Sequence, residues 1–206
     1  MQRQNDGVLH HGHYSLLESF NGSTYSVVFK KVTDLDQNSI VPDEIINNRQ
    51  VGSTILVSAP VGSFALATDA KSHVFISDGI GIGSFMAFLH ELNQQGKMSA
   101  VTLIQCVQTE GHAAFVDTLK KMLPQGQYKI LTEQKVISKS HLEGRIKPYT
   151  HIYVSGPEAF LTLTENALTS FNHPKSLIHM RSIESTLRIL QNNFSIVCFS
   201  CMVILF

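Results

Sequence analysis

The stretch VFISDGIGIGSFMAF, residues Val74–Phe88, decides how the rest of the chain is interpreted. A short apolar run typical of a buried strand leads into glycines at alternate positions (Gly79, Gly81 and Gly83), and apolar residues at helical spacing follow. Glycines leave backbone N–H groups open to an anion, and the start of the next helix adds partial positive charge. The stretch predicts a strand, a tight turn and a helix, and the turn is either a phosphate site or a turn whose glycines serve packing.

The same alternation of strand and helix patterns continues along the chain. Further buried strands are predicted at Val101–Cys106, Tyr128–Glu133 and His151–Gly156, and further helices at Ala113–Leu123 and Glu158–Phe171. Strands that alternate with helices indicate a parallel sheet covered on both faces. We therefore expect an α/β domain over residues 71–180.

The first 70 residues have a different pattern, which predicts antiparallel β structure. Strands are expected at His13–Ser19, at Ser23–Val32 after a turn at Asn21-Gly22, and at Ser53–Pro60. A short helix is expected to start near Pro42. The boundary between this β part and the α/β part is predicted at residues 68–72.

A second strand-to-helix turn strengthens the phosphate hypothesis. Ser155-Gly156-Pro157 follows a buried strand, and Pro157 suits a first helical position. Ligands bind at the carboxyl ends of parallel strands, so two such turns can flank one extended ligand. An ordinary βα loop is the alternative at this position.

Composition excludes several classes of protein. The chain has 206 residues, 43% of them hydrophobic and 16% charged, with a formal net charge of zero. We therefore expect no nucleic-acid partner. The three cysteines make no disulfide framework and the first residues contain no apolar signal region, so a reducing, cytoplasmic location is expected. The apolar run Phe194–Phe206 is too short to span a bilayer, and we treat residues 181–206 as an atypical tail.

Three smaller groups of residues are weighed as metal or redox sites. His10, His11 and His13 are either metal ligands or a solvated loop, and the loop is favoured because no ligand pattern accompanies them. Cys198 and Cys201 have redox spacing but lie in an apolar run, and Cys106 ends a buried strand, so inert thiols are favoured. We predict no metal site.

The order of these segments resembles the ferredoxin-reductase-like flavoproteins, in which a flavin-binding β-barrel precedes a nicotinamide-nucleotide domain. The similarity runs from about His13 to Met180 and looks most like the reductase part of flavohaemoglobin, the nitric oxide dioxygenase. Its most specific segments are QVGSTILVSAPVGSF, residues 50–64, and TEGHAAFVDTLKKML, residues 109–123.

The resemblance implies a role for each matching residue. The family's Arg-x-Tyr-Ser motif falls on residues 12–15, which implies that His13, Tyr14 and Ser15 line an FAD site. The family's glycine motif and Cys-Gly-Pro motif imply contacts to NAD(P)H from the following residues: Gly79, Ile80, Gly81, Ile82, Gly83, Ser155, Gly156 and Pro157. Flavin and nicotinamide carry the hydride themselves, so no catalytic side chain is assigned. No arginine follows the strand ending at Cys106, which favours NADH over NADPH.

The chain departs from the family at several of these positions. Gly12 stands where the family has an arginine, Asp78 replaces a glycine, Gly83 replaces a threonine, and Pro42 replaces a serine near the flavin. Only 13 residues precede Tyr14, so we expect an N-terminally truncated, divergent relative with a partial barrel over residues 1–70.

The sequence thus leads to two functional hypotheses. The first is an FAD-dependent NAD(P)H oxidoreductase module that passes electrons to an acceptor, with a haem or globin as the implied partner and a membrane not expected. The second is a remnant that binds a nucleotide or a partner without transferring electrons.

Overall fold

The computed structural model describes residues 2–5, 8–19, 21–30, 40–55, 57–132, 137–147, 149–183 and 196–202. The chain divides into two compact units, residues 63–185 and residues 1–62 together with 186–206. We describe each unit by itself.

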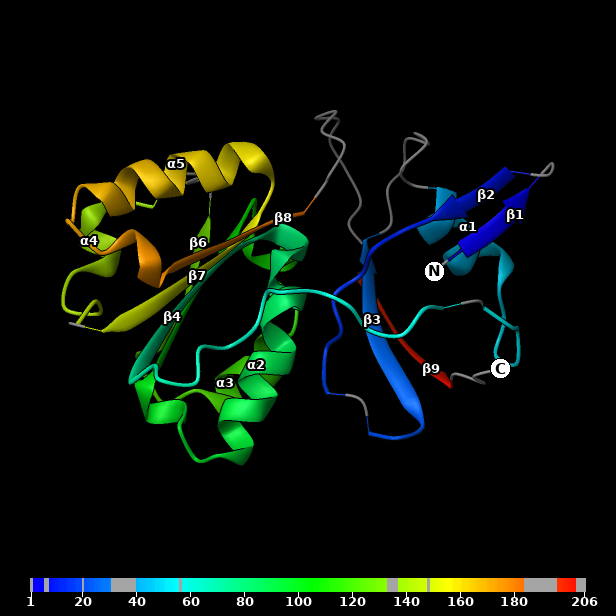
Figure 1. Ribbon diagram of the computed structural model, residues 1–206, viewed down its shortest axis with the longest axis horizontal. Coiled ribbons are helices and arrows are strands. Elements are labelled where there is room, and N and C mark those ends of the chain that lie inside the picture. The colour runs from blue at the N-terminus through cyan, green and yellow to red at the C-terminus, as the bar shows by residue number, and fades with distance from the viewer. Residues whose placement is uncertain are drawn as a thin grey trace. The chain divides into compact units, whose positions relative to one another are not determined.

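The larger unit is built on a five-stranded parallel sheet (Figure 1). Its strands lie in the order β6-β5-β4-β7-β8, and every neighbouring pair is parallel. The strands are β4 (Ser72–Asp78), β5 (Val101–Val107), β6 (Tyr128–Thr132), β7 (Thr150–Gly156) and β8 (Ile178–Ser182). The predicted parallel sheet is confirmed.

Helices cover both faces of this sheet, as expected for buried parallel strands. Figure 1 shows α4 and α5 over one face and α2 and α3 over the other. The helices are α2 (Gly83–Gln94), α3 (Val116–Met122), α4 (Lys139–Leu142) and α5 (Glu158–Thr169). Short 3-10 turns lie at η2 (Gly79–Ile82), η3 (Met98–Ala100), η4 (Glu110–His112) and η5 (Lys175–Leu177).

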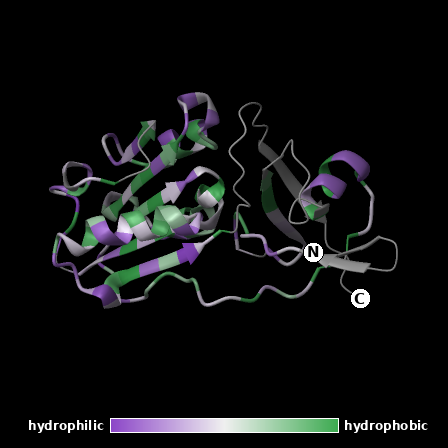
Figure 2. Ribbon diagram, turned by 90° about the horizontal axis from the view of Figure 1, so that it is seen from above, coloured by the Kyte–Doolittle hydropathy of each residue, from purple (hydrophilic) through white to green (hydrophobic). Residues whose placement is uncertain are grey.

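Alternating side chains of the strands divide the core between these two layers. Val74 and Ile76 of β4 belong to a buried cluster with Phe160 and Leu168 of α5. Phe75, between them in sequence, faces the other layer, where its ring centroid lies 5.0 Å from that of Phe85 in α2. Figure 2 shows hydrophobic residues along the central strands and hydrophilic residues in the connecting loops.

The helix predicted at Ala113–Leu123 is shorter in the structure. It begins at Val116 because Phe115, its N-cap, has a left-handed backbone with φ 61°. The preceding residues form the turn η4 and an extended link instead of a first helical turn.

The smaller unit contains two separate two-stranded antiparallel sheets. β1 (Gln2–Asn5) pairs with β2 (Val8–His11), and β3 (Thr24–Lys30) pairs with β9 (Ile196–Met202). Helix α1 (Ile40–Asn48) packs its Val41 and Ile45 against Val27 and Phe29 of β3.

The partial flavin-binding barrel is not seen in the described residues. Between His13 and Ser19 the expected strand reduces to one bridge, from Leu16 to Val27, and no strand is assigned to the described part of Ser53–Pro60. Residues that favour β structure need a neighbouring strand to pair with, and propensity alone does not supply it.

Residues 196–202 of the predicted tail form β9, whereas residues 184–195 and 203–206 lie outside the described residues. Within the described part of the chain, no helix has the length and apolar character needed to cross a membrane.

Candidate functional site

The two predicted loops lie side by side at the carboxyl edge of the sheet. β4 ends at Asp78 and leads through η2 into α2, and β7 ends at Gly156 and leads through Pro157 into α5. Ser77 and Ser155 are register partners on these neighbouring strands. The structure therefore brings Gly79–Gly83 together with Ser155–Pro157.

Gly81 is required by packing between these loops. A Cβ atom built on Gly81 would collide with the carbonyl oxygen of Ser155, a backbone atom that cannot turn aside. Gly81 thus lets the turn after β4 lie directly against the end of β7, as the packing interpretation of the glycines predicts.

Gly79 has a different reason to be glycine. Its φ of +53° is in the left-handed region that favours glycine, and no atom lies within 4 Å of the position that a Cβ would take. The space beside Gly79 is open, so this residue satisfies the condition that a phosphate-binding turn needs.

The other three residues of the predicted loop differ in exposure. Ile80 is half-buried, whereas Ile82 is fully buried and part of the core. Gly83 is the first residue of α2, and its N–H donates to the carbonyls of Gly81 and Ile80. Between Gly79 and Gly81, only Gly79 has open space where a side chain would lie.

The second loop is held by polar and steric contacts of its own. The buried Ser155 hydroxyl donates to Ser84 Oγ in the first turn of α2, at 3.1 Å. A Cβ on Gly156 would lie 2.9 Å from Phe160 Cδ1 and 3.0 Å from Asp78 Cβ, so this glycine makes room for both side chains. Pro157, predicted at the first helical position, is instead the N-cap of α5, whose first helical residue is Glu158.

Asp78 places a carboxylate at this edge, next to Cys106 on the neighbouring strand. Burial, with the charge of Asp78 adding to it, raises the pKa of the Cys106 thiol to about 12. Cys106 is therefore a neutral, buried thiol, as predicted.

The predicted flavin residues belong to the smaller unit. The Tyr14 ring packs edge-on against Phe29 with centroids 4.8 Å apart, and burial raises the pKa of Tyr14 to about 12. This ring also lies over Gly12, where a Cβ would collide with it. His13 is exposed and Ser15 is half-buried.

The end of β8 is a part of the site that sequence reasoning missed. Arg181 is the register partner of Ser155, and Ile183 N–H donates to the Gly156 carbonyl at 2.9 Å. The sequence feature that could have revealed it is the short run Ile178–Ser182, which follows the helix at Glu158–Thr169 and so continues the alternation of strands and helices.

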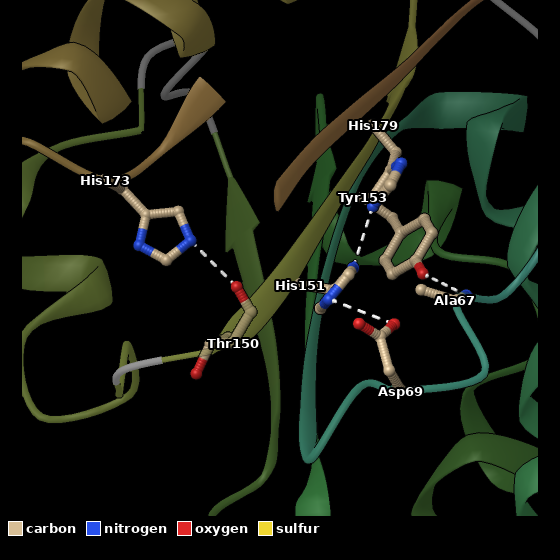
Figure 3. Close-up of polar contacts among 7 residues, drawn as sticks. All are labelled: Ala67, Asp69, Thr150, His151, Tyr153, His173 and His179. Carbon is tan, nitrogen blue, oxygen red and sulfur yellow. Dashed lines mark hydrogen bonds and ion pairs between the residues drawn. The ribbon is translucent and has the colours of Figure 1, made fainter. Parts of the chain in front are cut away.

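A cluster of histidines lies on the α2 side of the sheet, toward the amino ends of β7 and β8 (Figure 3). A hydrogen bond of 2.9 Å joins His151 Nδ1 and His179 Nε2, and His151 Nε2 lies 3.9 Å from Asp69. The Ala67 N–H donates to Tyr153 Oη at 2.8 Å, which holds residues 63–71 on the same face.

His73 of β4 belongs to the same cluster through its ring contact with Tyr153. No group of three metal-binding side chains occurs among the residues that the structure describes. Burial, with the charges of His151, Lys97 and His179 adding to it, lowers the pKa of His73 to about 4, and burial also lowers the pKa of His179. These three histidines form a layer beneath the segment 63–71, in which His151 stacks on His179 and His73 stacks on Phe75.

Comparison with known proteins identifies several reductases. No family model matches the chain. It is 26% identical to a flavohaemoprotein from Vibrio cholerae over 175 residues, covering 81% of this chain and 44% of that protein. It is 29% identical to the carnitine monooxygenase reductase subunit of Escherichia coli over 171 residues, covering 81% of this chain and 51% of that protein. The chain thus spans about half the length of the curated relatives that it matches.

A solved structure shows the same fold. The flavohaem-like FAD/NAD-binding domain of the nitric oxide dioxygenase from Vibrio cholerae superposes with a TM-score of 0.75 at 24% identity, covering 88% of this chain and 81% of that domain. The sheet and its helices therefore match the NAD-binding part of such reductases.

Proposed function

We propose, from its similarity to ferredoxin-reductase-like FAD/NAD-binding domains at about a quarter identity, that this chain is an FAD-dependent NAD(P)H oxidoreductase module. The module would pass electrons from NAD(P)H through FAD to an acceptor, as in the reductase part of a flavohaemoglobin. Its proposed domains are a flavin part at residues 1–70, a nucleotide part at 71–180 and the tail 181–206, whose first two residues, Arg181 and Ser182, complete strand β8 of the nucleotide part.

The observation that carries the proposal is the pair of glycine turns at neighbouring strand ends. Gly79 leaves open space before a 12-residue helix, and Gly81 and Gly156 let the two turns lie against one another. Backbone N–H groups and a helix N-terminus suit the diphosphate of a dinucleotide. The residues at this edge therefore fit a nicotinamide nucleotide.

The flavin part is proposed from sequence order and the relatives. Tyr14 offers an aromatic ring, and His13 and Ser15 flank it, but Gly12 provides no cation for a phosphate. The described residues of the smaller unit do not fit FAD as fully as the larger unit fits the nucleotide.

When bound, the two cofactors supply hydride and electron transfer themselves. This chain's residues would bind and orient the nucleotide. The turn at Gly79–Gly83 would take the phosphates, and Ser155-Gly156-Pro157 would bound the nicotinamide end. The buried hydrogen bond between Ser155 and Ser84 fixes the second turn against α2 and so sets the distance between these contacts.

The acceptor is proposed to be a haem or globin. This proposal is supported by two relatives, a flavohaemoprotein and the reductase subunit of a monooxygenase. NADH is favoured over NADPH, because the residues after β5 are Gln108, Thr109 and Glu110, none of which is a cation.

A second candidate function is a remnant that binds a nucleotide or a partner without transferring electrons. Asp78 favours it, because a carboxylate at the entrance of the loop repels phosphate. Gly12 favours it as well, because it provides no cation for the phosphate of a flavin. The Tyr14 ring occupies the space that an arginine at this position would need.

The visible absorption spectrum of the purified chain separates the two functions. We expect added FAD to bind and its absorbance to bleach when NADH is added without oxygen. NADH binding without bleaching would favour the remnant, and binding of neither FAD nor NADH would refute the oxidoreductase and leave only a partner-binding remnant.

A further inference from the structure

Arg181 lies at the same sheet edge as the two glycine turns. It is the register partner of Ser155, and the chain just beyond it is bonded to Gly156 through the Ile183 N–H. Residues 181–183 therefore form the third segment of this edge, next to the loop proposed to bound the nicotinamide.

The Arg181 guanidinium is held on the α2 side of the sheet. Its Cζ lies 5.9 Å from the centroid of the Phe64 ring, within the range of a cation–π contact. Phe64 in turn packs against Phe85 and Phe88 in the first two turns of α2, with centroids 6.2 and 5.6 Å away. The cation thus lies near the turns that begin α2.

No ion pair among the described residues uses this guanidinium, and the side chain is half-buried. An arginine held on an aromatic ring keeps its five N–H donors and its full charge available to an anion. The fork geometry suits two oxygens of one phosphate.

A row of polar side chains crosses the sheet at this level. The register places Gln105, Ser77, Ser155 and Arg181 on four neighbouring strands. The first three are buried, and Ser77 Oγ has no hydrogen-bond partner although its residue is fully buried. A buried hydroxyl without a partner is uncommon, and here it lies in the row that ends at Arg181.

We propose that the Arg181 guanidinium binds the diphosphate of the nucleotide directly and offsets the charge of Asp78. This inference rests on the proposed function. The two charges lie on opposite sides of the sheet. Asp78 is the register partner of Cys106, which belongs to the core cluster on the α5 side, whereas Arg181 lies over Phe64 on the α2 side. A diphosphate at this edge would be repelled by the Asp78 carboxylate and attracted by the Arg181 guanidinium.

The test compares four proteins: the wild type, Arg181→Gln, Arg181→Lys and the control Lys175→Gln. Lys175 is 80% exposed, so its variant makes the same change of charge on the surface of the same unit. Binding of NADH, ADP and adenosine is measured by calorimetry, and circular dichroism checks folding. We expect Arg181→Gln to weaken NADH and ADP about tenfold, Arg181→Lys less, and Lys175→Gln hardly at all.

Adenosine, which has no phosphate, decides whether the effect is electrostatic. Its affinity is expected to stay the same in all four proteins. Equal loss of adenosine and ADP affinity in Arg181→Gln would show a merely structural role and overturn the inference, as would unchanged NADH affinity. A wild type that binds no NADH would instead refute the proposed nucleotide function, and this inference with it.

Discussion

At the scale of single residues, the glycines of the first loop separate into two roles. Gly81 is explained by the backbone of Ser155 against it, and Gly79 by its positive φ beside open space. The sequence pattern treats both alike, because spacing carries no information on what each missing side chain would touch. Only Gly79 therefore counts as evidence for a ligand.

The packing role of Gly81 predicts a loss of stability on substitution. Gly81→Ala should lower the free energy of unfolding by about 1–3 kcal/mol, because its Cβ meets a backbone atom that cannot yield. Urea denaturation measures this. The control is Gly111→Ala, whose Cβ would have its nearest neighbour at 3.9 Å and which should cost less than about 0.5 kcal/mol. Equal stabilities would show that the two turns do not pack as described.

Neutralising Asp78 should tighten nucleotide binding, whereas neutralising Arg181 should weaken it. Asp78→Asn removes a negative charge at the entrance of the loop, so NADH should bind about threefold to tenfold more tightly. Fluorescence titration with NADH measures the dissociation constant, and a thermal melt checks that the fold is retained. Unchanged or weaker binding in a folded variant would argue against a diphosphate near this residue.

At the scale of elements, β7 and α2 are linked by the hydrogen bond between the Ser155 and Ser84 hydroxyls. Because both side chains are buried, the pair should contribute about 1 kcal/mol to stability. A double-mutant cycle with Ser155→Ala, Ser84→Ala and the double variant should give a coupling energy of about 0.5–1.5 kcal/mol in urea denaturation. A coupling energy near zero would mean that the hydroxyls do not interact in solution.

The sequence predicts the larger unit much better than the smaller one. Strands such as Val101–Val107 are buried on both faces, so their composition alone identifies them, and Pro124 and Gly126 end the α3 region. The strands expected at His13–Ser19 and Ser53–Pro60 depend on partners elsewhere in the chain, which a local pattern cannot contain. The pairing of β3 with β9 joins segments about 170 residues apart, and the apolar run Phe194–Phe206 indicated no partner.

The candidate site was predictable only in part, for the same reason. Both glycine turns follow from local patterns, and the parallel sheet brings them together. The contribution of β8 could not be predicted, because Arg181 is placed by its register with Ser155 and by the Phe64 ring, two long-range contacts.

At the scale of the whole molecule, the buried histidine layer makes stability depend on pH. The pKa of His73 is lowered to about 4 by burial, so the unfolded chain binds a proton more readily than the folded one below about pH 6.5. The contribution of the neutral His73 side chain to the free energy of unfolding is therefore fully present above about pH 6.5 and is lost as the pH falls toward 4. The lowered pKa of His179 acts in the same direction.

The variant His73→Phe tests this dependence. Phenylalanine keeps the stacking on Phe75 and the tilted ring contact with Tyr153, and it removes a buried nitrogen that has no partner. We expect the wild type to lose up to about 2 kcal/mol more than the variant between pH 7 and pH 5, measured by urea denaturation at both values. Parallel losses in the two proteins would mean that His73 is not buried as a neutral side chain.

The central claim is that the carboxyl edge of the sheet holds a nicotinamide nucleotide, and amide chemical shifts during a titration with NADH test it most directly. The glycines provide an internal comparison. Gly79, Gly81 and Gly156 lie at the carboxyl edge, whereas Gly96, Gly126 and Gly144 precede β5, β6 and β7 at the opposite edge. We predict that NADH shifts the first three signals in a saturable way and leaves the second three unchanged. Shifts confined to the second group, or none in either group, would contradict the account.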